Sequence, residues 1–378
     1  MFSAPGMDAS SLNSPLSRRG LLKGGAGAAL LATVGTQQML LRTPEDAVAA
    51  DAAARAVPMP AHMAGMDMSQ HSHSATASTE AVDQLKFGTP QPQPGGVARE
   101  YWIQARTATW DVAPTGRDDW HGMRVPRSRR FKAVVYQLMT EGFAKTAGPA
   151  AMPGPTLMAE VGDVIVVHLR NADKHFGEAI TMHPHGVRYT PDYDGVYLGD
   201  HTRAGGYIAP GEEFTYTWEA RPESVGAWPY HDHGPNHSLN AQRGLFGCLI
   251  VREKGAKAPD VEVPLFFGAL QPPVTGLRNS FECVNGRAFA GNTPTIRAKV
   301  GQDVAFHVFG NDNFFHDFHI HGHRWKDSGG AFIDTKTIGP SEGMTARWTE
   351  DNPGRWLYHC HVFSHQDMGM TGWYIVEP

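Results

Sequence analysis

The stretch "PGPTLMAEVGDVIVVHLRN", Pro153–Asn171, decides the fold because it occurs twice in the chain. Its second copy is "NTPTIRAKVGQDVAFHVFGN", Asn292–Asn311, which repeats the Pro-Thr start, the Val-Gly turn and the strand-like run after it. Short runs of β-branched and aromatic residues bounded by glycine and proline predict strands. The repeat therefore predicts two copies of one β unit, each about the length of a Greek-key sandwich.

The match between the two copies continues downstream. "MHPHGVRY" at 182–189 corresponds to "FHIHGHRW" at 318–325, and "GAWPYHDHGPNH" at 226–237 corresponds to "GRWLYHCHVFSH" at 354–365. Charged residues, glycine and proline gather in "REKGAKAPD", which is typical of a join between domains. We predict a first sandwich domain over 97–255 and a second over 256–378.

The composition favours an all-β protein and leaves small molecules and other proteins as possible partners. Of the 378 residues, 42 are glycine and 27 are proline, and no long amphipathic helical pattern is present. A net charge of -5 offers no basic surface for nucleic acid, and no polybasic block suggests an anionic membrane surface. Nucleic acid and membrane partners are therefore not expected.

The amino-terminal segment resembles a twin-arginine export signal. Arg18 and Arg19 directly precede a mildly apolar segment rich in glycine and alanine, and small residues suited to cleavage follow. Glycines interrupt the apolar segment, which argues against a membrane anchor. We predict a signal peptide over 1–56, a partly disordered Met-, His- and Pro-rich linker over 57–96, and a secreted, periplasmic or cell-envelope location.

The three cysteines do not form a disulfide framework. Cys248 and Cys283 both lie in apolar, strand-like settings, and burial as free thiols is favoured over a disulfide between them. Cys360 lies inside a histidine cluster.

Aligning the two copies shows that one of them has lost a site. Cys360, His316 and Met370 of the second copy correspond to Asp232, Ile180 and Gln242 of the first, whereas His365 corresponds to another histidine, His237. The second copy thus keeps a Cys-His-His-Met set of which the first has replaced three members.

These four residue types narrow the choice of metal. One thiolate, two imidazoles and a thioether ten residues after the cysteine are the ligands of a blue-copper electron-transfer centre, with three equatorial ligands and a long axial methionine. Met370 is preferred to Met368 because of the loop length. Structural zinc is the poorer interpretation, since a weak thioether ligand adds little for zinc.

Four His-x-His pairs occupy corresponding places in the two copies, which chance placement of 20 histidines does not explain. In a strand, alternate side chains face opposite sides, so Cys360 faces one way while His359 and His361 face the other. A metal held by Cys360 is then joined through the backbone to metals held by the histidines. Eight imidazoles are too many for one ion and suit a cluster of copper ions open to dioxygen.

The motifs "HPHG", "HDH", "HDFHIH" and "HCHVFSHQDMGM" resemble the four copper signatures of multicopper oxidases, and the two-domain layout resembles the bacterial two-domain small laccases. The resemblance implies cupredoxin domains and four coppers per functional unit: one type 1, one type 2 and two type 3. It assigns the type 1 copper to His316, Cys360, His365 and Met370, and the type 2 copper to His183 and His319. It assigns the type 3 pair to His185, His231, His233, His321, His359 and His361.

The resemblance also implies an activity and an assembly. The expected reaction is one-electron oxidation of phenols or aromatic amines coupled to reduction of dioxygen to water. Each copy supplies four of the eight histidines, and the family pattern implies a homotrimer with each cluster between neighbouring chains. Asp194 and Tyr189, just after His185, are candidates for proton delivery and for a hydrogen-bonded or redox-active phenol. A turn aspartate before Gly195 and a packed tyrosine are the alternatives.

Three other functions remain open at this stage. "MPAHMAGMDMSQHSHS", Met59–Ser74, carries soft ligands that suit Cu(I), so a cuprous-ion oxidase and a copper-storage protein are alternatives. A copper nitrite reductase also uses two cupredoxin domains, but it needs its type 1 set in the first copy, where Ile180, Asp232 and Gln242 stand.

Overall fold

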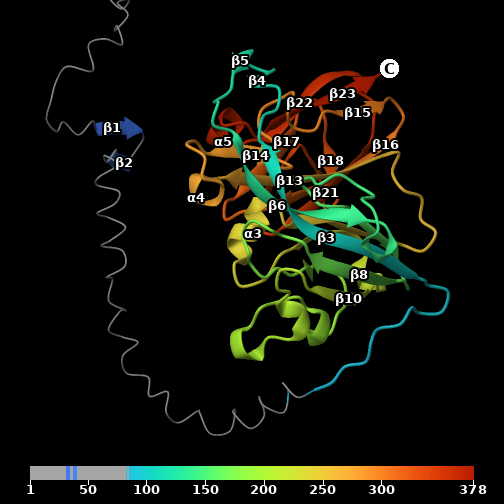
Figure 1. Cartoon of the computed structure of the whole chain (residues 1–378). Helices are drawn as coiled ribbons and strands as arrows, with labels where there is room; N and C mark the ends of the chain where they lie inside the picture. The colour runs from blue at the N-terminus through green and yellow to red at the C-terminus, as the bar shows by residue number, and fades with distance from the viewer. Residues whose placement is uncertain (1–30, 35–36, 41–81, 83–84) are drawn as a thin grey trace, which may run out of the picture. The chain divides into compact units, whose positions relative to one another are not determined.

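The computed structural model describes residues 31–34, 37–40, 82 and 85–378. Most of the predicted signal peptide and most of the predicted linker lie outside these residues. Within residues 1–81, which form a separate unit, β1 (Leu31–Val34) and β2 (Gln37–Leu40) pair as a small antiparallel sheet. A second unit begins at Val82 and contains both copies of the repeat (Figure 1).

The first copy of the repeat forms two four-stranded sheets. One sheet has the order β10 (Glu213–Glu219), β8 (Val164–Asn171), β3 (Ala98–Asp111), β6 (Arg130–Met139). The other has the order β7 (Leu157–Glu160), β12 (Phe246–Arg252), β11 (Gly226–His231), β9 (His183–Pro184). Strand β3 pairs parallel with β8, and β12 pairs parallel with β7.

The second copy, in the orange and red part of Figure 1, repeats this strand order and adds one edge strand, β20. One sheet has the order β21 (Gly343–Thr349), β16 (Asp303–Gly310), β13 (Val261–Leu270), β14 (Phe281–Val284). The other has the order β15 (Ile296–Lys299), β23 (Thr371–Glu377), β22 (Gly354–Cys360), β17 (His316–Ile320), β20 (Thr335–Ile338). The parallel pairs recur as β13 with β16 and β15 with β23. The predicted boundary between residues 255 and 256 lies in the connection from β12 to β13.

Short elements complete the fold. Two small hairpin sheets join β4 (Arg117–Asp118) to β5 (Met123–Arg124) and β18 (Trp325–Lys326) to β19 (Phe332–Ile333). The α-helices are α3 (His237–Arg243), α4 (Pro272–Thr275) and α5 (Phe363–Asp367). The 3-10 turns are η3 (Glu141–Phe143), η4 (Pro191–Tyr193), η5 (Gly199–His201), η6 (Ala204–Gly206) and η7 (Pro222–Ser224). In the described residues, no helix has the length and apolar character needed to cross a bilayer.

Each sandwich encloses its own apolar core, and a third cluster joins the two. This third cluster combines Phe246 and Ile250 of the first copy with Phe266, Leu270 and Phe309 of the second. Cys248 and Cys283 are both buried in it as free thiols, which confirms the preference over a disulfide. The joint cluster fixes one sandwich against the other through apolar burial.

Matching glycines explain why the histidine-bearing strands lie where they do. The ring of Tyr230 packs on Gly247, where a Cβ would lie 2.3 Å from the Tyr230 hydroxyl, and Tyr358 packs on Gly372 in the same way at 2.3 Å. The two hydroxyls donate to the carbonyl oxygens of Pro155 and Pro294, each at 2.6 Å. Only glycine admits so close a ring, and the tyrosines thereby fix the position of the next residue in each strand, His231 or His359.

The architecture confirms the predicted fold class: an all-β protein with two Greek-key β-sandwich domains of the cupredoxin type. The repeat seen in the sequence corresponds to a repeat in strand order, because each copy carries the same alternation of buried and exposed residues between equivalent turns.

Candidate metal centres

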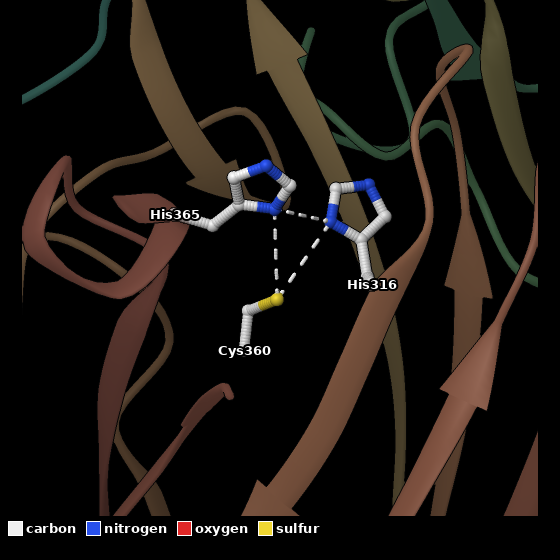
Figure 2. A group of neighbouring side chains, drawn as sticks. All are labelled: His316, Cys360 and His365. Carbon is white, nitrogen blue, oxygen red and sulfur yellow. Dashed lines mark hydrogen bonds between the residues drawn. The ribbon is translucent and has the colours of Figure 1, made fainter. Parts of the chain in front are cut away.

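The Cys-His-His set of the second copy forms one compact group (Figure 2). Cys360 ends β22, His316 begins β17, and His365 lies in α5. The sulfur of Cys360 lies 3.9 Å from Nδ1 of His316 and 3.6 Å from Nδ1 of His365, and the two nitrogens are 3.2 Å apart. All three ligand atoms face a common point, as a trigonal metal site requires.

The predicted axial ligand shares the same core. Met370 is fully buried with Cys360, whereas Met368 is 38% exposed. The backbone N–H of Cys360 donates to the carbonyl oxygen of Met370 at 3.1 Å. The N–H of Met370 in turn donates to the carbonyl oxygen of His365 at 3.0 Å. The loop from Cys360 to Met370 therefore returns to its starting point, as the sequence required.

The surroundings of this group favour a cation. Nε2 of His316 bonds to the buried carboxylate of Asp312 at 3.0 Å, which orients the ring so that Nδ1 faces Cys360. Burial opposes charge on His316, but hydrogen bonds to Asp312 and Cys360 outweigh it and raise the pKa of His316 to about 9. A buried site that stabilises positive charge, built from one thiol, two imidazoles and a thioether, fits copper.

The second-copy histidines form another group on the other side of strand β22. The ligand nitrogens of His319, His321 and His359 all lie within 4.8 Å of one another. The Nε2 atoms of His321 and His359 are 3.1 Å apart, and the His361 ring lies 5.2 Å from that of His319. Cross-strand pairing of His319 with His359 produces this arrangement.

The first-copy histidines form the matching group. His183 pairs with His231 across β9 and β11, and the Nε2 atoms of His185 and His231 are 3.0 Å apart. The ring of His233 lies 5.4 Å from that of His183, and its Nδ1 is buried without a hydrogen-bond partner. A buried imidazole nitrogen with a free lone pair is what a metal ligand offers.

Backbone carbonyl groups orient these rings in the same way in both copies. Nδ1 of His183 donates to the carbonyl oxygen of Asp194, and Nδ1 of His319 donates to that of Asp334, each at 2.8 Å. Similarly, His231 and His359 each bond to the carbonyl oxygen of the residue that follows them. This fixes the tautomer and leaves Nε2 of each ring free to bind a metal.

Burial favours the neutral form of three of the imidazoles. Desolvation, assisted by neighbouring histidines, lowers the pKa of His185 to about 4, that of His231 to about 3 and that of His359 to about 4. Neutral imidazoles retain the lone pairs that metal ions bind, so these three side chains are ready to bind metal at neutral pH.

The two histidine groups do not meet within one chain. In the part of the chain that the structure describes, every ring contact among these eight histidines stays within one copy. A cleft of about 330 Å³ covers the first-copy group, and its opposite wall includes Asn311 and Asp312 rather than the second-copy histidines. Each group is therefore half of the eight-histidine set.

The position of the lost site in the first copy is now a polar cluster. Asp232, which stands where the second copy has Cys360, is fully buried, and its carboxylate accepts from the backbone N–H of Thr181 at 2.6 Å. Burial raises the pKa of Asp232 to about 7. The remaining histidine, His237, stacks on His233 with ring centroids 4.6 Å apart.

Asp194 and Tyr189 lie beside the first-copy group. A carboxylate oxygen of Asp194 is 3.1 Å from Nδ1 of His183, in addition to the backbone contact. The ring of Tyr189 lies edge-on to His183 at 5.7 Å, and burial together with the charge of Asp194 raises the pKa of its hydroxyl.

Sequence reasoning missed two residues that support the Cys360 group. Asp312 orients His316 through its side chain, and the backbone N–H of Asp317 donates to the sulfur of Cys360 at 3.4 Å. Asp312 lies outside the quoted motifs, and although Asp317 lies in "HDFHIH", a backbone donor carries no signal in the side-chain sequence.

A pair of sandwiches carrying a Cys-His-His-Met group and two half-sets of imidazoles defines a copper redox protein. Two family models described as multicopper oxidase match residues 147–256 and 268–378, which together cover more than half of the chain. The chain therefore belongs to the multicopper oxidase family.

The relatives are longer proteins whose names state different activities. The mouse ferroxidase HEPHL1 is 28% identical over 350 residues, which cover 75% of this chain and 29% of that protein. A probable nitrite reductase-hydroxylamine oxidoreductase fusion protein of Kuenenia stuttgartiensis is 30% identical over 254 residues, which cover 62% of this chain and 29% of that protein. The chain thus spans less than a third of the length of these relatives.

Solved structures show the same fold. A multicopper oxidase crystal structure superposes with a TM-score of 0.59 at 23% identity, covering 78% of this chain and 94% of that one. The blue copper oxidase of Nitrosomonas europaea superposes with a TM-score of 0.56 at 24% identity, covering 74% of this chain and 86% of that one. A copper nitrite reductase from the same organism superposes with a TM-score of 0.54 at 20% identity, covering 74% of this chain and 94% of that one. The fold alone therefore does not separate these activities.

Proposed function

We propose that this protein is a laccase-type multicopper oxidase that takes single electrons from small aromatic donors and passes them to dioxygen. Strand β22 carries the proposal. Cys360 at its end faces His316 and His365, whereas His359 and His361 on either side belong to the histidine group. One short peptide segment thus joins a mononuclear site to a cluster site, which is the connection that an electron-transferring oxidase needs.

The residues divide into three kinds of copper ligand. We assign the type 1 copper to His316, Cys360, His365 and Met370, the type 2 copper to His183 and His319, and the type 3 pair to the other six histidines. When bound, the four coppers would supply one-electron uptake at the first site and four-electron reduction of dioxygen to water at the second. Asp312 and the carbonyl oxygens of Asp194 and Asp334 hold the rings in the orientation that binding needs.

We place the complete cluster between copies of the chain. The two half-sets do not meet within one chain, and each has exposed aromatic residues beside it. Tyr197 and Tyr207 are 42% and 50% exposed near His233, whose carbonyl oxygen accepts from the N–H of Tyr197 at 3.0 Å. Phe363, 70% exposed, lies 5.6 Å from the ring of His361. Association of unlike faces closes into a ring, and the family resemblance favours a homotrimer.

Proton delivery is assigned to Asp194, with Tyr189 beside it. Reduction of dioxygen to water consumes protons as well as electrons. The carboxylate of Asp194 contacts the ring of His183 and is partly exposed, so it links solvent to the first half-set. Tyr189, which lies edge-on to His183, would serve as a hydrogen-bonding phenol in the same region.

The experiment that tests the function is spectroscopy of the copper-loaded protein combined with oxygen uptake. We expect about four coppers per chain, an intense blue band that Cys360→Ser removes, a second ordinary copper signal by electron paramagnetic resonance, and oxygen uptake with a phenol. Copper binding without oxygen uptake would instead identify a carrier or storage protein.

Similarity to ferroxidases favours a second candidate. The mouse and human HEPHL1 proteins, 28% and 27% identical over 350 residues, are named ferroxidases. Ferrous or cuprous ions are therefore the alternative reductants. Comparing oxygen uptake with Fe(II), Cu(I) and a phenol at equal concentration distinguishes the two candidates.

Export by the twin-arginine route remains part of the proposal. Arg18 and Arg19 carry it, and they lie outside the described residues. Replacing both with lysine should leave the protein in the cytoplasm of the expressing cell, which fractionation would detect.

A further inference from the structure

A cleft of about 390 Å³ lies between the β4–β5 hairpin of the first sandwich and helix α5, which carries His365. Met123, Val125 and Phe289 give it an apolar wall, and Asp118, His121 and Asp367 supply polar groups. Asp367 is in α5, two residues after His365. A small cleft with an apolar wall and a few polar groups suits an aromatic molecule that carries a hydroxyl.

The hairpin wall of this cleft is fastened to the second sandwich. The backbone N–H of Thr115 donates to the side chain of Asn292 at 2.9 Å, and that side chain donates back to the carbonyl oxygen of Arg117 at 2.8 Å. The N–H of Asp119 donates to the carbonyl oxygen of Ala290 at 3.0 Å. The cleft is therefore a fixed feature between two domains rather than a gap beside a free loop.

Its aromatic wall is held in an uncommon backbone conformation. Phe289 has φ of 73°, a left-handed value that bulky residues rarely adopt. Its N–H donates at 2.7 Å to the carbonyl oxygen of Gly369, the residue before Met370. Strained backbone conformations are often found where a side chain is held in place for function. Here Phe289 connects the cleft to the segment that leads into Met370.

The polar end of the cleft contains a histidine oriented by a buried carboxylate. Nδ1 of His121 lies 2.7 Å from the carboxylate of Asp118, which also accepts from the backbone N–H of Trp120 at 3.0 Å. Asp118 is 3% exposed, whereas the side chain of His121 is 38% exposed. Because a carboxylate accepts, Nδ1 carries the proton, and Nε2 of His121 is left as an acceptor.

We propose that this cleft binds the phenolic reductant and that Nε2 of His121 takes the phenolic proton as the electron leaves. The inference rests on the proposed function. The O–H bond of the phenol would break, its proton would go to His121, one electron would pass to the copper that Cys360 would hold, and a neutral phenoxyl radical would depart. His121 then returns the proton to solvent, and Asp118 stabilises the transient positive charge on the ring.

The first test compares two electron donors. 2,6-Dimethoxyphenol must lose a proton on oxidation, whereas hexacyanoferrate(II) has none to lose. We expect His121→Phe to lower the phenol-to-hexacyanoferrate ratio of kcat/KM about 100-fold and Asp118→Asn to lower it less, since the acceptor remains. His175→Phe, at an exposed histidine outside the cleft, is the matched control and should leave the ratio unchanged. An unchanged ratio in His121→Phe overturns the proposal.

The second test measures binding without turnover. Calorimetric titration of the copper-loaded, fully reduced protein with 2,6-dimethoxyphenol under nitrogen should give a Kd that rises at least tenfold in Val125→Trp, which fills the cleft. An unchanged Kd together with normal oxygen uptake would overturn the cleft but leave the oxidase intact. Failure of the wild type to consume oxygen with either donor would instead overturn the proposed function itself.

Discussion

The backbone N–H of Asp317 donates to the sulfur of Cys360 at 3.4 Å. The carbonyl oxygen of the same residue accepts from the N–H of His361 at 2.6 Å. One residue of β17 thus supports a ligand of each proposed copper site. A hydrogen bond to a thiolate sulfur stabilises its negative charge, weakens its donation to an oxidised metal and raises the reduction potential.

Asp317→Pro should therefore lower the potential of the blue copper by about 40 mV, since a hydrogen bond of about 1 kcal/mol is lost in a one-electron couple. A redox titration that follows the blue absorption band measures this potential. Asp317→Asn keeps the N–H and is the control. Equal potentials in the proline variant and the wild type would show that this donor does not affect the copper.

Asp194 and Asp334 offer a matched pair of variants. Both residues orient a histidine through the backbone, but only the carboxylate of Asp194 also reaches its histidine, whereas that of Asp334 accepts from Thr335. We expect Asp194→Asn to slow reoxidation of the reduced enzyme by dioxygen about 100-fold with the blue band intact, because proton delivery is lost. Asp334→Asn should change this rate less than twofold, and stopped-flow absorbance measures both. Equal rates in the two variants would refute the proton role.

His237, the histidine that the first copy kept, should steady a cluster ligand by stacking on His233. His237→Ala removes the ring and should shorten severalfold the half-life of copper loss to a chelator, because the ring of His233 gains freedom. His237→Phe keeps a stacking partner and should stay close to the wild type. Copper released against time is the measurement, and equal loss from both variants would show that stacking is not the cause.

Subunit mixing tests whether the cluster lies between chains. One variant carries His231→Ala and His233→Ala, and the other carries His359→Ala and His361→Ala, so each alone should be inactive. Random co-assembly into rings of three makes about three quarters of the rings mixed. In each mixed ring, one of the three junctions joins two unaltered half-sets. About a quarter of wild-type oxygen uptake should therefore return. No recovery in rings shown to be mixed would place the cluster within one chain.

Glu350 should stabilise the second sandwich in a pH-dependent manner. Its buried carboxylate accepts from five donors: His323, Trp348, Tyr374 and the backbone N–H groups of Asp351 and Asn352. Burial opposes the charge, but these hydrogen bonds outweigh it and lower the pKa of Glu350 from its ordinary value of 4.5 to about 2. The resulting stability is present above pH 4.5 and is lost as the pH falls toward 2.

Glu350→Gln should therefore lower the free energy of unfolding of the metal-free protein by about 3 kcal/mol at pH 7, and the difference should shrink below pH 4.5. Guanidinium unfolding at several pH values measures it, with Glu223→Gln at an exposed position as the control. A difference independent of pH would mean that the charge of Glu350 is not responsible.

The sequence by itself determined the repeat, the fold class and the composition of the two histidine half-sets. Strand alternation is local, so "HCH" already places Cys360 opposite His359 and His361, and the chemistry of thiolate, imidazole and thioether already favours copper. Tertiary structure decided which distant groups support these ligands: Asp312 for His316, the backbone of Asp317 for Cys360, and the β4–β5 hairpin facing Phe289. The first two contacts depend on how distant strands and loops of the second sandwich come together, and the third depends on how the two sandwiches pack through their joint core. Neither residue type nor spacing in the sequence encodes that geometry.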